Sequence, residues 1–125
     1  MIWLAVAAGG ALGSMARHGV NILFATVLGR AVPYATASVN LIGSLTIGLL
    51  AALIASGRLQ LSLELRTFVF VGILGGFTTF SSFMLDTFTL GHGGDHTLAF
   101  WNVTLQTGFG LAAVWAGYRL GIAID

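Results

Sequence analysis

The chain has 125 residues, of which 57% are hydrophobic and 7% charged, and it contains five arginines, no lysine and four acidic residues. Soluble domains carry roughly 25% charged residues, so this composition excludes an ordinary water-exposed surface and indicates a lipid bilayer as the solvent. A formal net charge of +1 without a basic run excludes nucleic acid as a partner, and the lack of cysteine excludes disulfides and thiolate metal sites.

Four long apolar segments, separated by charged or glycine-containing stretches, predict an all-α membrane protein with four transmembrane helices in a single domain, residues 1–125. The segments cover about residues 2–28, 34–56, 67–90 and 98–124. The first begins without a basic region, so we expect a retained span and not a cleaved signal peptide. Four crossings place both termini on one side of the membrane.

The arginines specify the orientation of the predicted spans only weakly. Arg58, Arg66 and Arg119 fall on the side of the termini, and Arg30 falls on the other side. So small a bias permits insertion in both directions, and therefore antiparallel pairing of two copies. A fixed orientation with cytoplasmic termini is equally compatible with these charges.

Each predicted span carries two small residues four positions apart. The pairs are Gly9 and Gly13, Ser44 and Gly48, Gly72 and Gly76, and Gly117 and Gly121. Helices in lipid associate through close backbone approach, so these pairs predict helix–helix contact faces. A bundle packed this tightly has little interior left for a conduit, which favours an oligomer with its pathway between or beside subunits.

Two polar features stand out in the first two spans. Arg17 lies near the middle of the first, where an arginine costs from about 2.5 to more than 10 kcal/mol unless it is paired, reaches the interface or faces water. A structural role and a role in attracting an anion are both compatible with this position. Thr36, Asn40 and Ser44 form one stripe on the second span; such stripes most often join helices, but the amide of Asn40 can also donate to an anion.

The third span contains the most informative motif, Gly-Gly-Phe-Thr-Thr-Phe-Ser-Ser-Phe at residues 75–83. Paired glycines followed by two β-branched threonines predict a break in the helix near its middle. Backbone groups freed at membrane depth are tolerated only inside protein or along a cavity, where their carbonyls can bind a hard cation. Beyond the break, Phe80 and Phe83 share one helical face with serines beside them, and their positive ring edges can face an anion.

These residues resemble the Fluc, or CrcB, family of bacterial fluoride channels, and the resemblance covers essentially the whole chain. It rests on the 75–83 motif above all, and also on Gly9-Gly10, Gly13, Arg17, Val39-Asn40 and Gly43-Ser44. The family implies an antiparallel, dual-topology homodimer in the lipid of the bacterial inner membrane, with two fluoride pores and passive export of fluoride. It also implies one structural sodium ion (Na+) at the dimer centre, held by the backbone carbonyls of Gly75 and Thr78 from both subunits.

The resemblance also implies which side chains line the fluoride path. Phe80 and Phe83 would form its aromatic wall, Asn40 would donate beside them, and Ser82 would supply a hydroxyl. On the fourth span the polar face implied by the family reads Asn102, Gln106 and Gly110, with a glutamine where the family commonly has a serine. A fixed arginine in a narrow pore would hold an anion too tightly, so we expect Arg17 at a vestibule.

Two other classes of membrane protein are alternatives. A proton-coupled antiporter of the small multidrug resistance type also has four short spans, but it needs a carboxylate embedded in the membrane. The third segment offers only Glu64 at its entry and Asp86 toward its far end. A purely structural membrane subunit predicts no ion flux at all. The chain has no nucleophile, base and orienting group arranged as a catalytic set, so we do not expect an enzyme.

Overall fold

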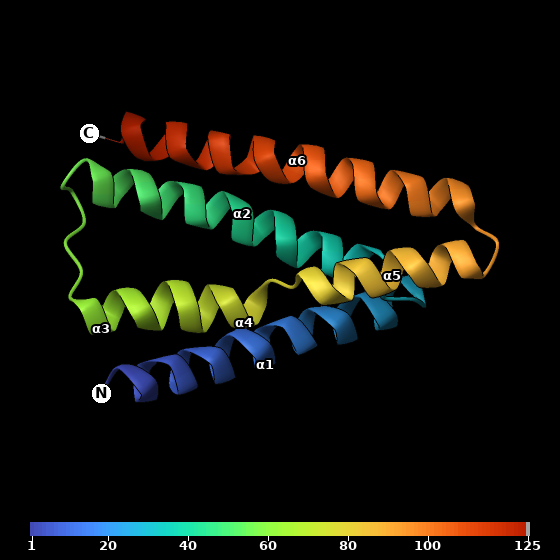
Figure 1. Ribbon diagram of the computed structural model, residues 1–125, viewed down its shortest axis with the longest axis horizontal. Coiled ribbons are helices and arrows are strands. Elements are labelled where there is room, and N and C mark those ends of the chain that lie inside the picture. The colour runs from blue at the N-terminus through green and yellow to red at the C-terminus, as the bar shows by residue number, and fades with distance from the viewer. Residues whose placement is uncertain (125) are drawn as a thin grey trace.

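The computed structural model describes residues 1–124, and every regular element among them is helical. The elements are α1 (Ile2–Leu28), α2 (Tyr34–Ala55), α3 (Leu63–Arg66), the π-helix η1 (Thr67–Leu74), α4 (Gly75–Phe77), α5 (Phe80–His92) and α6 (His96–Ala123). Because α3, η1 and α4 follow one another without a gap, they form the first half of one long helix, and α5 forms its second half. The prediction of four helices with a broken third is confirmed (Figure 1).

The third and fourth helices begin earlier than predicted because each has a capping side chain. Ser62 accepts a hydrogen bond from the Leu65 N–H, so the third helix begins at Leu63 and includes the polar stretch with Glu64 and Arg66. Asp95 accepts one from the Leu98 N–H, so α6 begins at His96. The N-terminus and the end of α6 lie at the same end of the bundle, as an even number of passes requires (Figure 1).

The lengths of the helices fit a bilayer. Two of them, Tyr34–Ala55 and Leu63–His92, are long and apolar enough to cross a membrane. The 27 residues of α1 extend roughly 40 Å at about 1.5 Å per residue, more than the hydrocarbon thickness of about 30 Å. Large apolar side chains cover the outside, whereas Asn102 and Gln106 are buried inside. This distribution is the reverse of that in a soluble domain.

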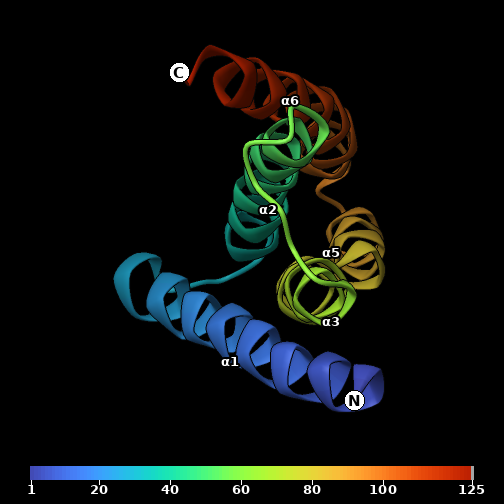
Figure 2. The same cartoon turned by 90° about the vertical axis from the view of Figure 1, so that its left-hand side faces the viewer.

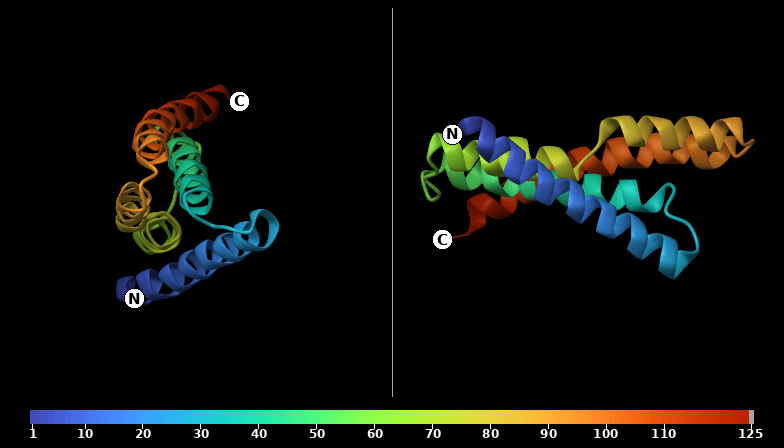
Figure 3. Two further views of the ribbon diagram at one scale, coloured as in Figure 1. Left: turned by 90° about the vertical axis from the view of Figure 1, so that its right-hand side faces the viewer. Right: turned by 90° about the horizontal axis from the view of Figure 1, so that it is seen from below.

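The helices are arranged as two pairs. The helix α1 packs on η1 and α4, while α2 packs along α6. Beyond the break, α5 leaves α1 and packs on α6 instead, so the third helix changes partners at its middle (Figure 3). Viewed along the bundle, α2 lies between α6 and α1 (Figure 2). It also contacts the third helix on both sides of the break.

Glycine pairs make the first close contact, between α1 and the third helix. A Cβ atom on Gly13 would overlap the carbonyl oxygen of Ile73, and one on Gly72 would lie 2.7 Å from the Cα of Gly9. Gly76 is equally confined, since its Cβ would lie 2.7 Å from the carbonyl oxygen of Gly10. The two backbones therefore touch, as the small-residue pattern predicts.

The contact between α2 and α6 is built in the same way. A Cβ atom on Gly117 would overlap the carbonyl oxygen of Leu45, and one on Gly48 would overlap that of Val114. The Oγ of Ser44 lies 3.9 Å from the Cβ position of Gly110 on α6, so Ser44 belongs to this contact, and it also lines a pocket beside the third helix. The predicted contact faces are thus confirmed.

This packing predicts opposite effects for the same substitution at two glycines of α6. Gly117→Ala should lower the melting temperature in detergent by several degrees, because overpacking typically costs about 1–3 kcal/mol and here the Cβ meets backbone. Gly108→Ala is the matched control: outside its own helix backbone, no atom of residues 1–124 lies within 4 Å of its Cβ position, and alanine favours the helix by about 1 kcal/mol. Equal melting temperatures for the two variants would contradict the packing described above.

Candidate functional site

The break in the third helix lies at two threonines. Thr78 and Thr79 are extended, with ψ angles of 162° and 122°, between α4 and α5. The paired glycines predicted to take part in the break remain helical in α4. Gly76 instead gives α1 room to approach. The break is therefore confirmed, but the β-branched residues form it, and Gly76 serves packing.

Threonine hydroxyls satisfy several backbone groups next to the break. Thr79 caps α5, because its hydroxyl oxygen accepts a hydrogen bond from the Ser82 N–H at 3.2 Å. The same hydroxyl donates to the Ser82 hydroxyl at 3.1 Å, which places this predicted pathway residue beside the break. The Thr78 hydroxyl donates back to the Leu74 carbonyl at 2.8 Å and so closes the end of α4.

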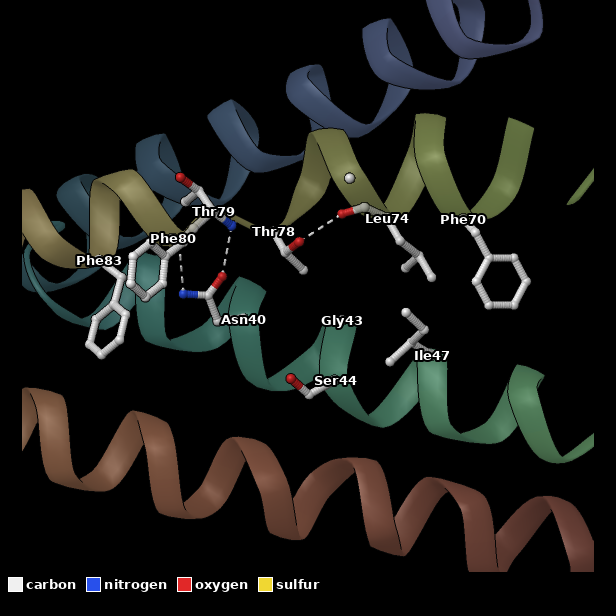
Figure 4. A pocket seen from close by; sticks show the side chains of 11 residues that line it. Asn40, Gly43, Ser44, Ile47, Phe70, Leu74, Thr78, Thr79, Phe80 and Phe83 are labelled. Atoms are coloured by element: carbon white, nitrogen blue, oxygen red, sulfur yellow. Dashed lines mark hydrogen bonds between the residues drawn. The ribbon is translucent and has the colours of Figure 1, made fainter. Parts of the chain in front are cut away.

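The side-chain amide of Asn40 clamps the extended backbone from α2. The Thr79 N–H donates to its Oδ1 at 2.8 Å, and its Nδ2 donates to the Thr79 carbonyl at 3.1 Å (Figure 4). Because a backbone N–H can only donate and a carbonyl can only accept, this pair of bonds fixes the orientation of the amide. A second bond from Nδ2 reaches the Oε1 of Gln106 at 3.0 Å. Both amide hydrogens of Asn40 are therefore engaged.

Gly43 makes room for the break on the same face of α2. It follows Asn40 by three positions, so the two residues lie side by side along the helix. A Cβ atom on Gly43 would overlap the Cγ2 methyl of Thr78. One residue of α2 thus binds Thr79 and another accommodates Thr78, and together they position α2 against the break.

Four side chains continue from the break as one directional chain of hydrogen bonds. Asn40 donates to Gln106, the Gln106 Nε2 donates to the Oδ1 of Asn102 at 2.8 Å, and the Asn102 Nδ2 donates to the hydroxyl of Thr87 at 2.9 Å. Thr87 then donates to the Phe83 carbonyl at 2.8 Å. We call this set, Asn40, Gln106, Asn102 and Thr87, the amide chain. It joins α2, α6 and α5.

The sequence pattern identified three of the four members of the amide chain. Asn102 and Gln106 share a face of α6, as their spacing of four predicts, and both are buried. Gly110 contributes no side chain at the next position. Thr87 was not predicted, although its spacing of four from Phe83 places both residues on one face of α5.

The two phenylalanines lie in contact beyond the break but in different surroundings. Their ring centroids are 6.1 Å apart at an interplanar angle of 78°, an edge-to-face arrangement. Phe83 is 7% exposed, whereas Phe80 is 72% exposed on the surface of the single chain. Both rings line one pocket of about 400 Å³, together with Asn40, Ser44, Thr78 and Thr79 (Figure 4). The prediction that the two rings share a face of the helix is therefore confirmed.

Arg17 is paired with the backbone of the break. Its Nη1 donates to the carbonyl of Thr78 at 3.3 Å, and its side chain is partly buried. Pairing of this kind is what an arginine in the middle of a span requires. The expected vestibule is a property of an assembled pore, so that position stays a prediction.

The carbonyls of Gly75 and Thr78 have the donor chemistry that a hard cation needs. In an unbroken helix they would accept from the N–H groups of Thr79 and Ser82, but these donate to Asn40 and to the Thr79 hydroxyl instead. Arg17 takes one of the two lone pairs of the Thr78 oxygen and leaves the other. The residues therefore fit a sodium ion, although two oxygens from one chain are too few to enclose it.

Asp86 is the acidic residue within the second half of the third helix. Its Oδ2 is buried and has no hydrogen-bond partner among the described residues. The other acid of this segment, Glu64, is exposed in the first turn of α3. Neither acid belongs to the amide chain or lines the pocket beside the break.

Comparison with known proteins gives matches over nearly the full length. The family model described as CrcB-like protein, Camphor Resistance (CrcB), matches residues 4–118. A protein of Paracoccus denitrificans named Fluoride-specific ion channel FluC is 50% identical over 119 residues, covering 95% of this chain and 93% of the relative. Relatives of the same name from Allorhizobium ampelinum and Rhodospirillum rubrum are 47% and 44% identical over 116 and 126 residues. These alignments cover 93% and 100% of this chain and 92% and 98% of the relatives.

Proposed function

The chain belongs to the CrcB family, and from that premise we propose that it is a fluoride-selective channel that exports F− passively from the cytoplasm. The family is one of ion channels and not of enzymes. The observation that carries the proposal is similarity along the whole chain, at 44–50% identity, to proteins named as fluoride-specific channels. Acidic surroundings let neutral HF diffuse into the cell, where it ionises, and the channel gives the trapped anion a way out.

The chemistry of the site supports this proposal. Fluoride is small and strongly hydrated, so a pore must replace its water with donors that bind it without trapping it. The amide chain supplies N–H and O–H groups beside the break, and the Phe80 and Phe83 rings offer positive edges next to Asn40. In the proposed pathway these two rings form the wall, with Asn40, Ser82, Asn102 and Gln106 as the polar groups.

An antiparallel homodimer with two pores is part of the proposal, with each chain crossing the bacterial inner membrane four times. Phe80 is 72% exposed on the single chain, at the mouth of a pocket that holds the break. A second copy covering this face would place Phe80 inside a pathway and not in lipid. The weak bias of the arginines permits the two opposite orientations that such a dimer needs.

A structural sodium ion completes the proposed assembly. The carbonyls of Gly75 and Thr78 from both copies would hold it, which doubles the two oxygens that one chain provides. When bound, the ion supplies a fixed positive charge that ties the two breaks together. Within one chain, Asn40 and the Thr79 hydroxyl accept the bonds of the two N–H groups that these carbonyls would accept in an unbroken helix.

The proton-coupled antiporter is not favoured. Such an exchanger needs a carboxylate in its transport path, whereas Asp86 lies outside both the amide chain and the pocket beside the break. The long matches to fluoride channels point the same way.

The direct test of the proposed function is ion efflux from liposomes that contain the purified protein. Vesicles loaded with potassium fluoride and supplied with a potassium ionophore should release fluoride without an imposed proton gradient, and an ion-selective electrode records the release. Vesicles loaded with chloride are the control and should retain their anion. No fluoride efflux, equal efflux of chloride or a strict need for a proton gradient would contradict a passive fluoride channel.

The aromatic wall is tested by removing each ring. Phe80→Ile and Phe83→Ile should each reduce fluoride efflux severely while the protein still assembles as a dimer, because isoleucine keeps apolar volume but has no positive ring edge. Phe88→Ile is the matched control, since this ring of α5 is 67% exposed and stacks on His92 away from the pocket. Efflux at the rate of the unmodified protein in both test variants would refute the assignment.

A further inference from the structure

Asn40 lies where the pocket meets the amide chain. Its side chain lines the pocket together with Phe80 and Phe83, and its Nδ2 donates to Gln106, which is 8% exposed on α6. An anion that reaches the pocket therefore meets an amide whose two hydrogens are already bonded to oxygen. One of those bonds must open before Asn40 can donate to the ion.

The two hydrogen bonds that the Asn40 Nδ2 donates differ in the free energy that it costs to break them. The bond to the Thr79 carbonyl is half of the clamp on the break, and its loss would leave a backbone acceptor unpaired at membrane depth. The bond to Gln106 joins two side chains, and the glutamine can move by rotating about its own bonds. An anion can therefore compete for the second hydrogen without opening the break.

The rest of the amide chain holds Gln106 from its other end. The Gln106 Nε2 donates to Asn102 at 2.8 Å, and Asn102 in turn donates to Thr87 at 2.9 Å. Asn102 is 6% exposed, so it is well enclosed. When Oε1 leaves Asn40, these links to α5 can stay in place.

We propose that Gln106 sets the affinity of the channel for fluoride, because its Oε1 is a resident acceptor that competes with the anion for the second amide hydrogen of Asn40. This inference rests on the proposed function. The carbonyl oxygen of Gln106 stands 3.0 Å from the Asn40 nitrogen, a normal hydrogen-bond distance. Fluoride binds by replacing one acceptor with another, and the energy of the displaced bond is subtracted from its binding.

The test is to remove the competing oxygen while keeping the shape of the side chain. Gln106→Met is unbranched, of similar length and lacks an amide oxygen. A single net hydrogen bond corresponds to a change in equilibrium constant of about two- to tenfold. We therefore expect the dissociation constant for sodium fluoride to fall by about that factor in titration calorimetry on the purified protein. The half-saturating fluoride concentration for efflux should fall by a similar factor.

A merely structural role for Gln106 predicts the opposite direction, because a disrupted site binds fluoride more weakly. An unchanged or weaker affinity in Gln106→Met would overturn the proposal. Gln106→Glu provides a second measurement that keeps an acceptor facing Asn40: we expect unchanged or weaker fluoride binding, and tighter binding would overturn the proposal. Thr104→Val is the matched control on α6, since its hydroxyl is exposed and donates to the Phe100 carbonyl of its own helix. It should match the unmodified protein.

The outcomes also separate this inference from the proposed function. If the unmodified protein neither binds nor conducts fluoride, the proposed function fails. If it does both and Gln106→Met binds no more tightly, the competition model alone fails.

Discussion

Backbone groups at membrane depth need hydrogen-bond partners inside the protein. This constraint is strongest at the two extended residues of the third helix, because they lie outside the regular hydrogen bonds of a helix. The hydrocarbon of a bilayer offers no water, so each N–H or C=O left unsatisfied in it would cost several kcal/mol. Asn40 meets the need at Thr79 with one acceptor and one donor, and the hydroxyls of Thr78 and Thr79 close the flanking helix ends. The position of α2 follows, because its amide must reach the break while Gly43 accommodates Thr78.

The break also decides how the bundle is assembled. A straight third helix would continue along α1, but the turn at Thr78 and Thr79 directs α5 to α6. Glycines hold the first half against α1, whereas Asn102 bonds to Thr87 on the second half. The same interruption that creates freed carbonyls thus brings the polar face of α6 next to the break. The freed carbonyls and the packing of the bundle therefore share one structural cause.

The sequence was a good guide to features that depend on local pattern. Hydropathy placed the four helices within a few residues, and the glycine spacing identified the backbone contacts at Gly13 and Gly117. The 75–83 motif predicted the break, although its two glycines remain helical and Gly76 packs on α1. The spacing of Asn102 and Gln106 also correctly placed them on one face of α6.

Features that depend on how two helices are placed against each other were not predictable. The bond from Asn40 to Gln106 joins residues 66 positions apart, and that from Arg17 to Thr78 joins residues 61 apart. Helix crossing angles and the shift of one helix along another bring these groups together. Neither can be predicted from the hydrophobic periodicity of a single segment. The same holds for Phe80 and Phe83, which share a face but differ in exposure because only Phe83 is covered within its own chain.

The clamp on the break is tested most directly by solid-state NMR on the protein in lipid bilayers. Threonine labelled with 15N and 13C carbonyl identifies the Thr79 nitrogen uniquely, since Thr79 alone follows another threonine. With asparagine labelled at the side-chain carbonyl carbon, the account predicts a short-range dipolar contact between that nitrogen and Asn40, in keeping with an N···O distance of 2.8 Å, and its loss in Asn40→Ala. A Thr79 nitrogen that shows no contact with any asparagine side chain would contradict it.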